Sequence, residues 1–274
     1  MCRRGPVNRR GPGVGGLLLI AAVAVLLPAS VIAQATTTRV MIRVASHDAK
    51  IIGSAVGGVR ITVRDARTGS LLARGVQEGG SGDTRRLVIE PRVRGQRVFD
   101  TEGAAGFLAE LELTRPTQVR IEAEGPLGTP HASQRVSRTM LLVPGHDVLG
   151  DGVILVLYGF TVDLMEPSGD LHDAAGTEIA VRARVTMLCG CATEPGGHWD
   201  STAYMIEARI VEDDKVLETA ILVYAGEPSV YAGRITVPVE DGLTLQVLAM
   251  DPSTGNFGMV EKLFDESGAG QSSE

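Results

Sequence analysis

The chain has 274 residues, of which 26 are lysine or arginine and 33 are aspartate or glutamate, so its net charge is −7. An acidic chain of this kind lacks the basic patches that nucleic acids and anionic membrane surfaces require of a partner. The composition therefore argues against both kinds of partner, and the length is sufficient for two modest domains.

Residues 1–35 have the pattern of a secretory signal peptide. Four arginines and no acidic residue precede the short apolar run 17–27, and Ala-Gln-Ala stands at 33–35. A basic start, an apolar run of about 7–15 residues and an A-x-A end are the features of such a leader. We expect cleavage after Ala35, with Ala33 as the second choice, and a periplasmic or extracellular protein. An uncleaved membrane anchor is the alternative.

Alternation with period two dominates the chain after the leader. The segments 39–44, 59–64 and 119–124 each place apolar residues on one face and mostly charged residues on the other. This pattern is typical of antiparallel strands that are buried on one side. Helical spacing is missing from every long stretch, although 104–113 fits a short helix or a strand equally well. The sequence therefore predicts an all-β fold.

The strand candidates divide into two tandem antiparallel β-sandwich domains. The first is predicted at 36–159 and closes with the apolar run 153–157. The second is predicted at 160–266, and the tail 267–274 is expected to be disordered because its residues are small and polar. Seven short strands separated by turns are expected in the second domain, the number typical of an immunoglobulin-like sandwich. These strands are 160–164, 178–191, 204–212, 216–224, 231–237, 243–250 and 259–264.

Both predicted domains carry segments that resemble known modules. In the second domain, Tyr231–Pro238, Asp241-Gly242 and Val247–Asp251 with Gly255-Asn256 resemble the last strands of the Ig-like modules of bacterial secreted proteins. In the first domain, Val59–Leu72 resembles transthyretin-like or carboxypeptidase regulatory-like modules. The resemblance implies a β-sandwich fold and does not imply one activity, because such folds host many functions.

The segment 187–200 concentrates unusual residues. It contains Cys189, Cys191, His198 and Trp199, and the tryptophan is the only one in the chain. If the strand 178–191 stays regular, both thiols lie on its inner face, since residues two apart share a face. Two thiolates and an imidazole at Cys189, Cys191 and His198 would suit Cu(I) or Zn(II), which gives a possible metal site.

Two other interpretations of this segment remain open. In an oxidising compartment Cys189 and Cys191 can form a disulfide. Glu194, His198, Trp199 and Asp200 can instead form a binding surface, because loops at the ends of a sandwich commonly carry recognition and an exposed tryptophan is a strong anchor. Against this, Trp199 can pack over the core while His198 remains in solvent.

The sequence shows no constellation of residues for catalysis. The five histidines are scattered, and Ser81 is not part of a nucleophile elbow. We therefore expect an exported, non-catalytic binding or accessory protein whose partner is another exported or envelope protein. A periplasmic copper or zinc carrier is the alternative.

Overall fold

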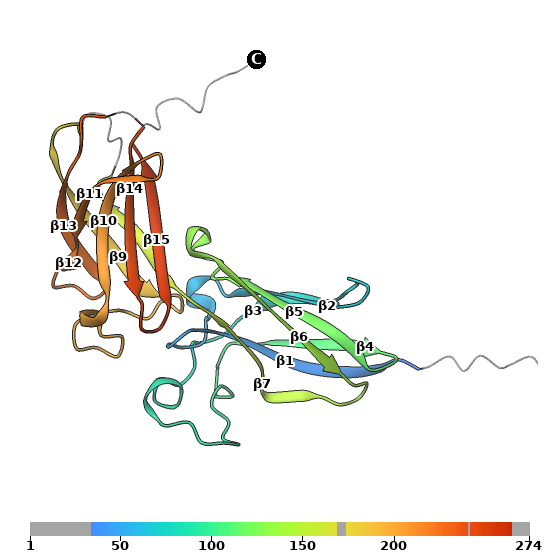
Figure 1. Cartoon of the computed structure of the whole chain (residues 1–274). Coiled ribbons are helices and arrows are strands. Elements are labelled where there is room, and N and C mark those ends of the chain that lie inside the picture. Colours follow the sequence, from blue (N-terminus) through green and yellow to red (C-terminus); the bar gives the residue numbers. More distant parts are fainter. Residues whose placement is uncertain (1–33, 169–173, 241, 265–274) are drawn as a thin grey trace, which may run out of the picture. The chain divides into compact units, whose positions relative to one another are not determined.

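The computed structural model describes residues 34–168, 174–240 and 242–264 (Figure 1). The described residues from Gln34 onward belong to one compact unit. The predicted signal peptide up to residue 33 and the predicted disordered tail lie outside the described residues, so both stay predictions. Within the part of the chain that is described, no helix has the length and apolar character needed to cross a membrane.

The first sandwich contains two sheets of different sizes. A three-stranded sheet has the order β4-β1-β7, and a four-stranded sheet has the order β3-β2-β5-β6. The strand bounds are β1 Thr36–Ser46, β2 Val59–Asp65, β3 Leu71–Gln77, β4 Phe107–Leu113, β5 Thr117–Gly125, β6 Gln134–Leu142 and β7 Val148–Leu157. The expected all-β fold is confirmed.

The second sandwich contains two four-stranded sheets. Their orders are β11-β10-β14-β15 and β12-β13-β9-β8, and Figure 1 shows β10, β14 and β15 side by side. The strand bounds are β8 Phe160–Glu166, β9 Glu178–Met187, β10 Met205–Glu212, β11 Lys215–Ile221, β12 Val223–Tyr224, β13 Val230–Thr236, β14 Thr244–Asp251 and β15 Asn256–Leu263.

Short helical turns connect some of the strands. The described residues include the 3-10 turns η1 Ser54–Val56, η3 Pro130–Ala132 and η5 Ser201–Ala203, together with the π-helical segment η2 Arg85–Ile89. The segment η2 lies at the start of residues 85–97, which contain five arginines. Its buried Leu87 packs with Ile51, Val98 and Ala105 in a small separate apolar cluster.

The alternation in the sequence produces the two cores. In β1 the side chains of Val40, Ile42 and Val44 are buried, and in β9 those of Val181, Ala183 and Val185 are buried. Full burial of a Val, Leu or Ile side chain contributes roughly 1.5–3 kcal/mol relative to exposure, so these inward faces hold the sheets together.

The structure differs from the expectation in its strand pairing. All expected pairings were antiparallel, but β1 pairs in parallel with β7, from Val40 opposite Val148 to Ser46 opposite Leu157. The ambiguous segment 104–113 forms a strand, β4, over most of its length. β3 and β6 were not predicted. The expected boundary between the domains, near Gly159, stays a prediction.

The predicted strand 216–224 is two strands in different sheets. β11 pairs with β10 and β12 pairs with β13, so the chain crosses between the sheets at Leu222. The Leu222 side chain is buried, and its backbone N–H donates to Ile206 O at 2.8 Å. A buried residue at the crossing continues the apolar pattern, and this is why the sequence reads as one strand.

Candidate functional site

β9 ends at Met187, so the expected regular strand to Cys191 is wrong. The backbone N–H of Gly190 donates to Met187 O at 2.8 Å, and that of Met187 donates to Cys191 O at 3.1 Å. Gly190 has φ of +76°, a left-handed conformation that glycine adopts without steric cost. The chain therefore reverses in a tight turn, and a bridge between Thr186 and Ala192 closes it.

The turn brings the two cysteines together as a disulfide. The Cα atoms of Cys189 and Cys191 are 5.4 Å apart, within the range for such a bond, and their sulfur atoms are bonded. The Cys189 side chain is buried, whereas Cys191 is half-buried. Sulfur in a disulfide is not the thiolate that binds Cu(I) or Zn(II), so the predicted metal site with His198 requires prior reduction of this bond.

A metal site at the cysteines would need further ligands. Among the described residues there is no group of three or more His, Cys, Asp or Glu side chains placed to hold a metal ion. His198 is exposed, and its ring lies 6.1 Å from the Trp199 ring in an edge-on arrangement. The structure thus brings Cys189 and Cys191 together and does not add His198 to them.

A buried hydrogen-bond network fixes the chain just after the disulfide. The Thr193 hydroxyl donates to Val185 O at 2.7 Å and lies 2.9 Å from the Tyr231 hydroxyl. Its backbone N–H donates to Ser229 Oγ at 3.1 Å, and Ser229 N–H donates back to Thr193 O at 2.8 Å. Because buried polar groups are costly without partners, this network strongly favours one position for the segment.

Trp199 is buried and is not an exposed anchor. Only 8% of its surface is exposed, and it belongs to the core of the second sandwich. Its indole N–H donates to Asp48 O at 3.0 Å, and Ala49 joins the same apolar cluster. In the structure Trp199 packs over the core, as one of its two interpretations had it, and it is not an exposed anchor. The side chain serves as an internal anchor for the loop.

Asp200 organises the loop through its carboxylate. Its Oδ1 accepts backbone hydrogen bonds from Gly196 and Thr202, both at 3.0 Å. The hydrogen bond from Gly196, followed by that from Thr202, holds the pKa of Asp200 below its ordinary value. The backbone N–H groups of Gly197 and Ser201 both donate to Glu194 O at 3.2 Å. The loop is thus closed internally from 194 to 202.

Tyr204 follows the loop and stays protonated near neutral pH. Burial, followed by the charges of Asp251 and Asp48, raises the pKa of its hydroxyl to about 12. Its ring packs at 5.0 Å from the Phe160 ring. A neutral hydroxyl held in this way can take part in hydrogen bonds, but it does not act as a base at physiological pH.

Three of the four predicted binding residues have side chains that reach solvent. His198 and Asp200 are exposed and Glu194 is half-buried, while Trp199 is turned inward. An imidazole and two carboxylates on a fixed backbone can form directed hydrogen bonds and ion pairs with a partner. The roles of Thr193, Ser229 and Asp48 were not predicted from the sequence, because they depend on contacts between residues 36 and 151 positions apart.

No protein-family model matches the chain, and no curated protein matches it. Among solved structures, an engineered protein is similar at 15% identity and a TM-score of 0.28, over 44% of this chain and 23% of the other. The fibronectin(III)-like modules of CbhA from Clostridium thermocellum are similar at 12% identity and 0.26, over 83% and 90%. A biofilm-associated protein domain is similar at 10% identity and 0.22, over 86% and 30%. The fold assignment rests on the strands and cores described above.

Proposed function

We propose that this chain is an exported, non-catalytic binding or accessory protein, and that the loop 188–202 recognises another exported or envelope protein. The observation that carries the proposal is the way in which the loop is held. A disulfide, the Thr193 network, the buried Trp199 and the Asp200 carboxylate each fix a different part of it.

Such fixation favours binding because a rigid loop loses little conformational entropy when it meets a partner. Ordering one flexible side chain at an interface costs about 0.5–1.5 kcal/mol, and ordering a loop costs more. The backbone of 188–202 is already ordered by contacts inside the chain. The partner then meets His198 and Glu194 in one arrangement, with Pro195 and Gly196 exposed between them.

The sequence supports both export and an accessory role. The leader 1–35 supports export to the periplasm or beyond, where a disulfide can persist. The resemblance of the two sandwiches to transthyretin-like and Ig-like modules supports a role as an accessory unit. We therefore propose an exported accessory protein whose partner is a protein of the cell envelope.

A copper or zinc carrier that uses Cys189, Cys191 and His198 is the alternative function. It requires both sulfurs as thiolates and the imidazole drawn toward them. Metal binding there would then appear only after the disulfide is reduced and would disappear in His198→Ala. Elemental analysis of the reduced and the unreduced protein for copper and zinc distinguishes the carrier from the binding module.

The binding function is tested by site-specific crosslinking in the envelope of producing cells. A photo-crosslinking residue replaces His198 in one variant and Arg67, an exposed turn residue of the first sandwich, in the matched control. We expect a discrete adduct from position 198 that is missing from position 67. Identical adducts from both positions, or none from 198, would contradict the proposal.

With the crosslinked partner purified, single substitutions measure the contribution of each loop residue. We expect His198→Ala and Glu194→Ala each to weaken binding at least about fivefold, the change produced by 1 kcal/mol at a contact that matters. Arg67→Ala should leave the affinity unchanged. Equal affinities for all three variants would place the interface away from the loop.

A further inference from the structure

The outward face of the sheet β3-β2-β5-β6 carries a hollow that is rich in arginine. The hollow has a volume of about 280 Å³, and all four strands contribute residues to its lining. Four arginines and two glutamates line it, which gives a local net charge of +2 in a chain whose overall net charge is −7. The arginines are Arg60, Arg64, Arg74 and Arg135. A local reversal of sign of this kind favours an anionic ligand.

The side chains that line the hollow point away from the core of the first sandwich. On β2 the intervening residues Ile61 and Val63 are buried in that core, and side chains alternate between the two faces of a strand. Arg60, Thr62 and Arg64 therefore share the outward face. The backbone beneath them is paired with β3 on one side and with β5 on the other, so the hollow is built on regular strands and not on a loop.

Arg64 and Arg74 are close enough to hold one anion between them. The strand register places Arg74 directly opposite Thr62, and Arg64 is the second residue after Thr62 along β2. Diagonal neighbours on adjacent strands are about 7–8 Å apart, which is within reach of long side chains. The two guanidiniums thus come from adjacent strands and line the same hollow, together with Thr62.

Neither of these two guanidiniums is neutralised within the described part of the chain. The ion pairs of this face include neither Arg64 nor Arg74. Among the described residues, the one hydrogen bond from the Arg64 side chain goes to Gly69 O, at 3.1 Å. Two positive charges that are diagonal neighbours repel each other, and an anion between them would relieve this repulsion. The planar guanidinium is also the side-chain group best shaped to bind a carboxylate with two parallel hydrogen bonds.

The two glutamates of the hollow restrict the kind of anion that fits. Glu124 is already paired with Arg60 at 3.0 Å and with Arg135 at 3.1 Å. Glu122 has Arg120 at 4.0 Å and accepts no hydrogen bond among the described residues. Its carboxylate would repel a small dianion such as sulfate, and its oxygens need donors. The ligand that suits the hollow therefore combines a carboxylate with several hydroxyl groups.

We propose that this hollow binds a uronate residue of an acidic glycan. The uronate carboxylate pairs with Arg64 and Arg74. Its hydroxyl groups donate to Glu122 and exchange hydrogen bonds with Thr62, which lies directly opposite Glu122 in the sheet. Leu71, which is 53% exposed and lines the hollow, offers an apolar surface to the sugar ring. The hollow is at the small end of the range for ligand pockets, about 300–1,000 Å³, and this size suits one sugar unit.

The position of the hollow favours a glycan over an acidic peptide. A peptide that binds a sheet commonly adds a strand to an exposed edge and is held by backbone hydrogen bonds. The hollow lies on the face of the sheet and offers side chains, which suits a ligand with many hydroxyl groups around one carboxylate. The site is on the first sandwich and does not use the loop 188–202, so it goes beyond the proposed function and stands or fails independently of it.

The test is a calorimetric titration of the purified protein, with its disulfide intact, using trigalacturonate at low ionic strength. The neutral trisaccharide maltotriose and the peptide triglutamate are the comparison ligands. We expect trigalacturonate to bind at least about tenfold more tightly than either, because charged hydrogen bonds and hydroxyl contacts are both required. Added salt should weaken its binding, since the guanidiniums are open to solvent. No binding of trigalacturonate, or equal binding of triglutamate, would overturn the glycan site.

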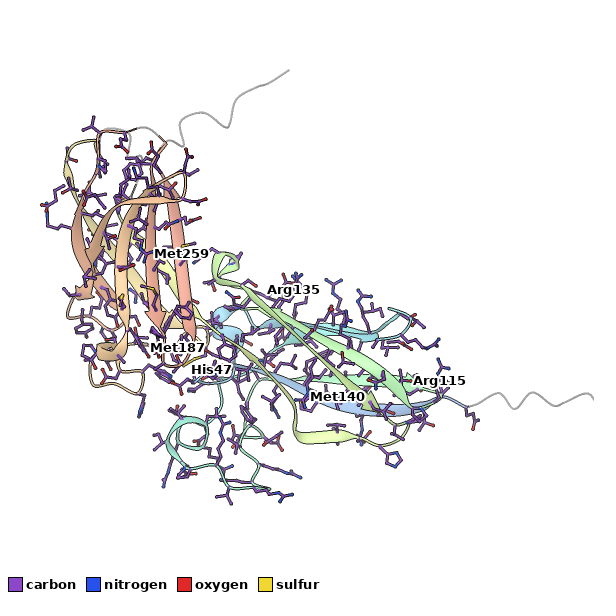
Figure 2. The ribbon with its side chains drawn as sticks, in the orientation of Figure 1. His47, Arg115, Arg135, Met140, Met187 and Met259 are labelled. Atoms are coloured by element: carbon purple, nitrogen blue, oxygen red, sulfur yellow. A yellow bond between two sulfur atoms is a disulfide. The ribbon has the colours of Figure 1, made fainter. Side chains whose placement is uncertain are left out.

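Variants place the binding in the hollow. Arg64→Gln and Arg74→Gln remove the charge and keep most of the side chain, and each should weaken the binding of trigalacturonate at least about tenfold. Arg115→Gln, at an exposed arginine ahead of β5, is the matched control and should retain the affinity. Figure 2 labels Arg115 and also Arg135, which lines the hollow, toward opposite ends of the first sandwich. Thermal unfolding checks that the variants are folded. Unchanged affinity in both hollow variants, or an equal loss in the control, would overturn the site.

Discussion

Glu124 and Glu207 each accept hydrogen bonds from arginine on the outward face of a four-stranded sheet, but their surroundings are opposite. Glu124 receives Arg60 at 3.0 Å and Arg135 at 3.1 Å, and its side chain is 34% exposed among charged neighbours. Glu207 receives Arg209, and its side chain is 7% exposed, with the apolar residues Ile221 and Leu248 opposite it on the neighbouring strands. Both faces follow the same alternation. The chemistry that gathers on each face is set by which strands pair and in which register.

The largest effect expected from this contrast is on stability. Arg209→Ala leaves the Glu207 carboxylate buried without its partner, and we expect it to lower the free energy of unfolding by about 2 kcal/mol, between the costs known for exposed and for buried pairs. Arg60→Ala on the first sandwich should cost less than about 1 kcal/mol, because Glu124 keeps Arg135 and is open to solvent. Urea denaturation of both variants measures the difference.

A double variant controls this comparison. Replacing both residues by apolar ones, with Glu207→Leu and Arg209→Met, removes the buried charge together with its partner and should recover most of the lost stability. If Arg209→Ala and Arg60→Ala have equal effects, Glu207 is solvated in solution and is less buried than described.

An intermediate effect is expected on chemical reactivity. Mild peroxide should oxidise Met205 and Met259, which are exposed, well before Met187, which is 1% exposed in the core. Peptide mass spectrometry over time gives the order. Early oxidation of Met187 would show that the core of the second sandwich opens readily.

The smallest effect is a dependence on acid at the first face. The hydrogen bond from Arg135, with a further one from Arg60, holds the pKa of Glu124 below its ordinary value. A depressed folded-state pKa contributes stability above the unfolded pKa, and this contribution is lost as pH falls through the folded value. Glu124→Gln should therefore be less stable than the wild type at neutral pH and approach it in acid. A constant difference across pH would contradict the assignment.

The strands that could be predicted from the sequence are those with one face buried in a core and the other face in solvent. β1, β2 and β5 were found because Val, Ile and Ala alternate with charged residues. β3 and β6 were missed because they are the edge strands of their sheet and bury few side chains, so alternation is weak in them. The parallel pairing of β1 with β7 depends on tertiary contacts that local periodicity does not contain.

For the candidate site, the sequence identified the right segment but not its geometry. The pair Cys189 and Cys191 and the only tryptophan marked it. The turn depends on the left-handed Gly190, and the burial of Trp199 depends on Asp48, which is 151 residues away. The outward apolar rows of the sheet β11-β10-β14-β15 were not predicted either, because Met205 and Met250 are brought opposite each other only by the pairing of β10 with β14.

The central claim is that the loop 188–202 is held in one conformation for recognition, and the disulfide is its covalent part. The most direct test is thiol alkylation of the protein isolated from the cell envelope without reductant, followed by peptide mass mapping, which separates Cys2 from the other two cysteines. We predict that the peptide with Cys189 and Cys191 is alkylated only after reduction. Two reactive thiols at these positions before reduction would contradict a covalently closed binding loop.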